Sequence, residues 1–74
     1  LYEGKGVEQN YKEAFNWFLK AANSGHVIAQ RILGSMYING KGVEPDFDQA
    51  VYWYKKGAEQ GDDDCKATLK LLGY

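Results

Sequence analysis

The stretch Gly40-Lys41-Gly42-Val43-Glu44 decides the fold, because the same five residues also stand 36 positions earlier, at Gly4-Lys5-Gly6-Val7-Glu8. Further residues agree at this offset without a gap, namely Ala14 and Ala50, Trp17 and Trp53, Ala22 and Ala58, Gly25 and Gly61, and Leu33 and Leu69. A period of roughly 20–50 residues is typical of solenoids and related repeat arrays. The sequence therefore predicts two copies of one repeating unit.

One helix in each period is marked by its ends. Asn10, with Glu13 three residues on, has the pattern of a helix N-cap, and Asp46 with Gln49 repeats that pattern. Gly25 and its repeat mate then stand where a helix closes on a residue with positive φ. We therefore predict a helix that begins directly after each cap and ends before each glycine.

A second helix is predicted after each of these glycines. Ala29, Leu33 and Tyr37 recur every fourth residue, which indicates a helix over about 27–38, and its repeat mate falls over about 62–72. Because the links are short, neighbouring helices must run antiparallel. The predicted fold is an all-α α-solenoid of antiparallel helical hairpins, with five helical segments (the first only a stub) and no strands.

The domain organisation follows from the repeat. The whole chain, 1–74, is expected to be a fragment of a longer array, with one period over 3–38 and the next over 39–74. Neither end has the polar character of a terminal capping repeat. The segments 4–25 and 40–61 are expected to share nearly the same backbone.

Composition limits the classes of partner. The net charge of −1 argues against nucleic acid or an anionic membrane as a partner. No apolar run approaches the roughly 20 residues that a membrane helix needs. Cys65 is the single cysteine, so it cannot form an internal disulfide, and no His/Cys spacing suggests zinc.

The residues with potential chemistry each have a simpler structural interpretation. The glycine pairs lack the spacing of a phosphate-binding loop, and His26 has no evident nucleophile beside it, so we interpret them as loop and cap or surface residues. Asp62-Asp63-Asp64 suits a helix N-terminus, with weak cation binding as the alternative. Cys65 is interpreted as a small buried residue rather than a reactive thiol. Trp17 and Trp53 are interpreted as packing residues rather than ligand-stacking platforms. No catalytic, metal or cofactor site is predicted.

The anchor residues of the repeat also resemble a known family. Leu33-Gly34, Tyr37, Gly40-Lys41-Gly42-Val43, Ala50, Trp53-Tyr54 and Ala58-Glu59-Gln60-Gly61 resemble the Sel1-like repeat signature, over essentially all 74 residues. The last helix departs from this pattern, because Lys70 stands in place of Gly34 and Gly73 in place of Tyr37. Sel1-like repeats are similar to tetratricopeptide repeats, and the resemblance implies a right-handed superhelix with an adaptor role.

The resemblance also implies that the first helix of each hairpin lines a concave, partner-binding face. On this helix a stripe at i, i+3, i+7 and i+10 lies away from the Ala29, Leu33 and Tyr37 stripe. With its repeat mates, the predicted partner-binding set is Tyr2, Glu3, Ile28, Arg31, Ser35, Ile38, Asn39, Asp64, Ala67 and Leu71. Arg31 is the predicted centre, and a bridge from Arg31 to Glu3 or Asp64 is the alternative role. The convex face, with Lys12, Asn16, Asp48, Tyr52 and Lys55, is a competing interface.

The predicted function is a non-catalytic protein–protein interaction scaffold or adaptor. Its partner would be a protein or peptide on the concave stripe, besides the neighbouring repeats of the parent chain, and it would need no cofactor. An internal structural spacer is the alternative. A third class is implied by cysteine-rich Sel1-like proteins with β-lactamase-type activity, but a single cysteine and the absence of an SxxK pair argue against it here.

Overall fold

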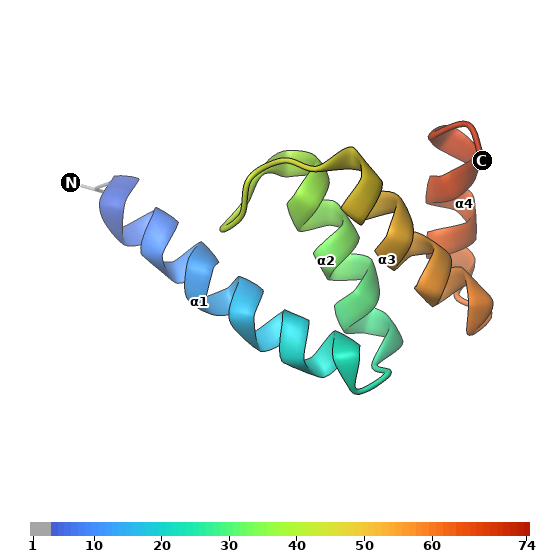
Figure 1. Ribbon diagram of the computed structural model, residues 1–74, viewed down its shortest axis with the longest axis horizontal. Helices are drawn as coiled ribbons and strands as arrows, with labels where there is room; N and C mark the ends of the chain where they lie inside the picture. The colour runs from blue at the N-terminus through green and yellow to red at the C-terminus, as the bar shows by residue number, and fades with distance from the viewer. Residues whose placement is uncertain (1–3) are drawn as a thin grey trace.

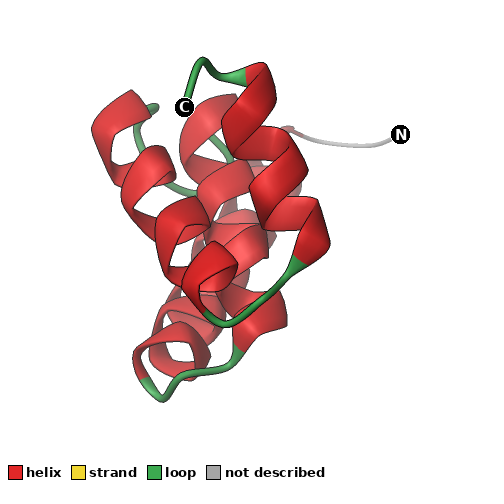
Figure 2. Ribbon diagram, turned by 90° about the vertical axis from the view of Figure 1, so that its right-hand side faces the viewer, coloured by secondary structure: helices red, strands yellow, loops and turns green. Residues whose placement is uncertain are grey.

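The protein is an all-α chain of helical hairpins. The computed structural model describes residues 4–74, with side-chain burial and contacts for residues 10–74. In that part of the chain there are four helices and no strand: α1 (Gly4–Asn23), α2 (Val27–Asn39), α3 (Phe47–Glu59) and α4 (Asp63–Leu71). Each helix packs against the next one in chain order; short turns join α1 to α2 and α3 to α4, and the longer loop 40–46 joins α2 to α3 (Figures 1 and 2). The all-α, hairpin-repeat prediction is confirmed, while the predicted stub helix lies before the described residues.

The ends of the helices follow the predicted chemistry in the second copy. The backbone N–H of Gln49 donates to the Asp46 carboxylate at 3.2 Å, which caps the start of α3. The backbone N–H of Cys65 donates to the Asp62 carboxylate at 2.9 Å and caps α4 in the same way. Gly25 has a φ of 96°, in the left-handed region that favours glycine, directly after α1.

The start of α1 differs from the prediction. Asn10 is not an N-cap, because α1 begins at Gly4 and runs through the segment that corresponds to the loop 40–46. Residues 4–10 and 40–46 therefore have different backbones, although both contain the Gly-Lys-Gly-Val-Glu sequence. The physical difference is Pro45, which cannot donate a helical hydrogen bond and keeps the residue before it out of helical geometry, whereas Gln9 has neither restriction.

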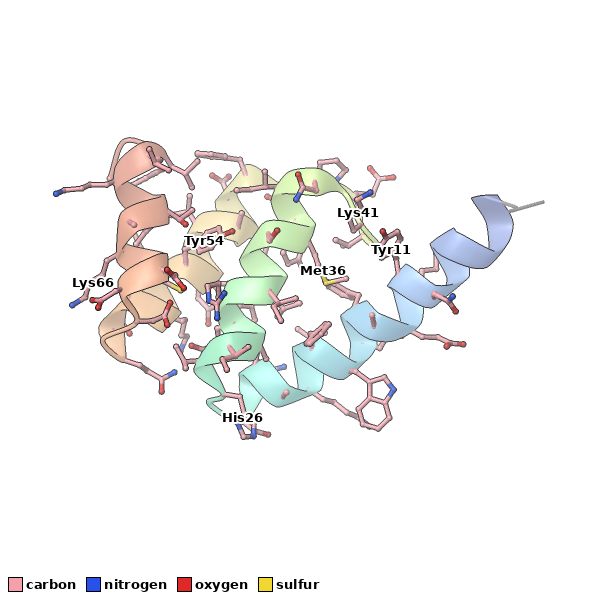
Figure 3. The ribbon with its side chains drawn as sticks, turned by 180° about the vertical axis from the view of Figure 1, so that it is seen from behind. Tyr11, His26, Met36, Lys41, Tyr54 and Lys66 are labelled. Atoms are coloured by element: carbon pink, nitrogen blue, oxygen red, sulfur yellow. The ribbon has the colours of Figure 1, made fainter. Side chains whose placement is uncertain are left out.

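Two apolar clusters hold the hairpins together. The first joins α1, α2 and α3 through Ala22, Ala29, Leu33, Met36 and Trp53, and the second joins α3 and α4 through Ala50, Val51, Tyr54, Cys65 and Leu69. Tyr37 of α2 contacts both clusters. Figure 3 shows Met36 between α2 and α1, and Tyr54 between α2 and α4. The predicted core stripe on α2 is thus confirmed.

Small residues let the helices approach closely at defined points. The ring of Tyr54 lies over Gly34, where a Cβ atom would be 2.7 Å from the ring. Gly57 lies against the sulfur of Cys65, so an added Cβ atom at this position would overlap the sulfur. Gly42 packs directly on the backbone of Tyr11, so the loop after α2 is seated on α1. These three glycines therefore allow close contacts between neighbouring elements, and of the three only Gly42 has a glycine, Gly6, as its repeat mate.

Candidate partner-binding surface

The predicted stripe forms one surface across two helices. We call it the α2–α4 surface, and α2 and α4 run in the same direction beside α3 (Figures 1 and 3). Its described residues are Ile28, Arg31, Ser35, Ile38 and Asn39 of α2, and Asp64, Ala67 and Leu71 of α4. None of these side chains is buried. Tyr2 and Glu3 lie outside the described residues.

Large apolar side chains on this surface are exposed. Leu71 is 87% exposed, Ile28 is 59% exposed and Ile38 is 40% exposed. The helical spacing explains their position, because the opposite side of each helix already carries the buried Leu33 or Leu69. Exposed apolar groups on two neighbouring helices offer area that a partner could cover, whereas single exposed apolar residues are ordinary on protein surfaces.

Arg31 links the two helices of the surface. Its Nε lies 3.7 Å from Oδ2 of Asp62, and its Nη1 lies 3.8 Å from Oδ2 of Asp64. These distances describe ion pairs that are too long for hydrogen bonds, and exposed pairs of this kind contribute only about 0–1 kcal/mol. The bridge to Asp64 is the alternative role foreseen from the sequence, whereas the pairing with Asp62 was missed, because that residue was assigned only to the helix start.

Hydrogen bonds and burial shift the pKa values of Asp62 and Cys65, which lie beside Arg31. Hydrogen bonds from the Cys65 backbone N–H and thiol, with the positive charge of Arg31, lower the pKa of Asp62. Burial and the neighbouring Asp62 raise the pKa of the Cys65 thiol to about 12. Cys65 is fully buried, so it stays protonated and is a packing residue, as predicted, and the reactive-thiol alternative has no support.

The other predicted polar residues have modest roles. Asn39 donates a side-chain hydrogen bond to the hydroxyl of Ser35 at 3.2 Å, within the α2–α4 surface. His26 precedes α2 and is exposed, but its side chain makes no capping hydrogen bond, so only the surface part of its predicted role is confirmed. Asp62 caps the start of α4, and Asp63 and Asp64 stand in its first turn, as predicted for a helix N-terminus. No group of three or more His, Cys, Asp or Glu side chains within the described residues is arranged to hold a metal ion.

The two tryptophans have different environments despite their equivalent places in the repeat. Trp53 is 5% exposed and belongs to the core cluster of α1 and α2, which confirms its predicted packing role. Trp17 is 73% exposed, so the packing role predicted for it is wrong in this structure. The reason is that α3 packs on α2, the helix before it, and in residues 4–74 no helix stands before α1 in that position.

A glutamine network between the hairpins was missed from the sequence. Buried Gln30 donates to the carbonyl of Ala22 at 3.1 Å and accepts a 2.8 Å hydrogen bond from Gln60. Gln60 also donates to the carbonyl of Gly25 at 3.0 Å, so it ties the two turns together. No repeat signal marks this network, because the residue 36 positions after Gln30 is Lys66.

The competing convex residues are also accessible. Lys12 and Asn16 of α1 are exposed, as are Asp48, Tyr52 and Lys55 of α3. Lys55 lies over the ring of Tyr74, 5.1 Å from its centroid. Exposure alone therefore does not choose between the two faces. Among residues 4–74, no helix is both long enough and apolar enough to cross a bilayer.

The fold and the repeated contacts define a helical-repeat protein of the α-solenoid type. The Sel1 repeat family matches the chain twice, at residues 1–26 and 27–62, and the chain belongs to this family. The second match, 27–62, pairs α2 with α3. Sel1 repeats are generally protein-interaction modules, and the family is generally non-catalytic.

A solved structure also places the chain among Sel1 repeat proteins. The crystal structure of a Sel1 repeat protein from Oxalobacter formigenes is similar to this chain, with a TM-score of 0.82 and 42% sequence identity. The similarity covers 93% of this chain and 28% of that protein, so the chain spans less than a third of its length. No curated protein matches the chain.

Proposed function

We propose that this chain is a non-catalytic protein-interaction scaffold whose protein or peptide partner binds on the α2–α4 surface. One observation carries the choice of surface: it exposes more large apolar side chains than the competing face. Ile28, Ile38 and Leu71 are exposed on the α2–α4 surface, whereas Tyr52 is the one exposed large apolar side chain among the competing residues. Exposed apolar area on neighbouring helices is what a protein partner can bury.

The contrast with Trp17 supports this choice. Trp17 is exposed, but its mate Trp53 is buried by the helices before it, so the exposure of Trp17 depends on its place in the chain. The α2–α4 surface also combines apolar, charged and amide side chains, which is a mixture typical of non-obligate interfaces.

Site-specific photo-crosslinking in the full parent protein tests the proposal. A benzophenone amino acid replaces Leu71 on the α2–α4 surface in one variant and Lys55 on the competing face in the other; both positions are exposed. Adducts with another protein should form through position 71 and not through position 55. Adducts through position 55 alone would assign the partner to the convex face.

An internal structural spacer is the second candidate, and one observation favours it. The charge of Arg31 is already balanced within the chain by Asp62 and Asp64, so Arg31 has no need of a carboxylate from a partner. If this candidate is correct, neither position 71 nor position 55 forms adducts with another protein, although the same reagent placed in a known interface does.

A further inference from the structure

The charges on the α2–α4 surface are unevenly distributed along its length. Asp62, Asp63 and Asp64 stand together at the start of α4, and among the described residues Arg31 is the one cation that forms ion pairs there, with Asp62 and Asp64. Part of this negative charge is balanced by the positive end of the α4 helix dipole, but Asp64 remains largely exposed to solvent. The surface is therefore acidic where α4 begins.

The opposite end of the surface is apolar. Ile38 near the end of α2 and Leu71 at the end of α4 are both exposed. Since α2 and α4 run in the same direction, their C-terminal ends lie at the same end of the surface (Figure 1). Ile28 adds an exposed apolar side chain at the start of α2, beside the acidic end.

From this polarity we infer that the partner of the α2–α4 surface is a short extended segment that carries a basic residue and an apolar residue. The basic group pairs with Asp64, and its aliphatic stem packs on Ile28, as the stems of long basic side chains do. The apolar residue covers Leu71, which lies on the same helix as Asp64. This inference rests on the proposed function and adds the chemistry of the partner.

The spacing of the two groups follows from helix geometry. Asp64 and Leu71 are two turns apart on α4, which corresponds to about 10 Å at 1.5 Å per residue. An extended segment rises about 3.3 Å per residue. The basic and apolar residues of the partner should therefore lie about three positions apart, in the pattern basic-x-x-apolar.

Selection from a phage-displayed library of random peptides tests this inference. The bait is the 74-residue chain, and counter-selection uses the Leu71→Glu variant to discard peptides that bind elsewhere. Recovered peptides are synthesised, and their affinity is measured by fluorescence anisotropy for the wild type, for Asp64→Asn and for Lys66→Gln. The last two variants each remove one exposed charge from α4, and Lys66 points away from α2 (Figure 3).

The expected result is a basic-x-x-apolar consensus. Asp64→Asn should weaken binding about two- to fivefold, the range for one exposed ion pair, and added salt should reduce this difference. Lys66→Gln should have no such effect. Acidic or uncharged peptides, an equal response of the two variants, or no recovered peptide would overturn the inference. The crosslinking at position 71 tests the proposed function independently. If adducts form there, the proposed function stands even when the peptide inference is wrong; if they do not form, the proposed function is wrong.

Discussion

The contact between Gly57 and Cys65 predicts a measurable coupling. Where α3 packs on α4, Gly57 of α3 faces the fully buried Cys65 of α4. At the equivalent positions of α1 and α2 stand Ala21 and Ala29, and both belong to the apolar cluster there. The two helix pairs therefore fill equivalent spaces with different residues: a glycine and a cysteine between α3 and α4, and two alanines between α1 and α2. Each single exchange should destabilise the chain, and the double exchange should restore it.

The magnitudes follow from the structure. In Gly57→Ala the new methyl group overlaps the sulfur of Cys65, and such overpacking costs about 1–3 kcal/mol. Better helix propensity offsets about 1 kcal/mol of this loss, so the net loss is about 0–2 kcal/mol. Cys65→Ala removes one buried heavy atom and should cost about 1 kcal/mol. In the double variant the methyl group fills the space left by the sulfur, so its stability should be close to the wild-type value.

Thermal and urea unfolding, followed by circular dichroism, measure this cycle. A change of 1 kcal/mol shifts the melting temperature of a domain of this size by about 4–8 °C, so a coupling energy of about 1–3 kcal/mol is resolvable. Ala67→Gly, at an exposed position of α4, measures the propensity contribution without a packing change. If the losses of the two single variants simply add in the double variant, the close contact does not have the energetic role assigned to it.

Three further predictions concern single positions. Trp53→Ala should cost about 3–5 kcal/mol in free energy of unfolding, whereas the matched Trp17→Ala should stay within about 0.5 kcal/mol; equal losses in urea unfolding would contradict this. The raised pKa of Cys65, about 12, means that an unfolded thiol with a pKa of about 8.5 ionises first. Stability should therefore fall as pH rises from about 9 to 12, and Cys65→Ala should flatten this part of the profile. Gln9→Pro, which copies Pro45, should remove the first turns of α1 from the far-ultraviolet circular dichroism signal without lowering the melting temperature; an unchanged signal would refute the role assigned to proline.

Local sequence predicted α2 and its neighbouring helix ends well, because caps, turn glycines and helical spacing each act within a few residues. The cap at Asp46, the glycine after α1 and the four-residue spacing on α2 all depend on neighbours in the chain. The buried cysteine was predicted by its small repeat mate, Ala29. These features were accessible because side-chain chemistry and helix periodicity determine them without knowledge of distant contacts.

Distant contacts explain what the sequence missed. The pairing of Arg31 with Asp62 needs the angle between α2 and α4, and the bond between Gln30 and Gln60 joins residues that differ from their repeat mates. The α2–α4 surface itself was proposed from helix spacing, and its polarity became apparent only once both helices were placed relative to α3.

The two copies of the Gly-Lys-Gly-Val-Glu segment show how much the neighbouring helix matters. In the second copy, the loop is held by tertiary contacts, since the backbone N–H of Asp46 donates to the Tyr37 carbonyl at 3.0 Å and Gly42 packs on the backbone of Tyr11. The first copy has no described helix before it to supply such contacts, so its backbone groups are satisfied within α1 instead. The exposed Trp17 has the same cause. The same five residues therefore differ in structure because only the second copy is followed by Pro45 and has described helices against which its loop packs.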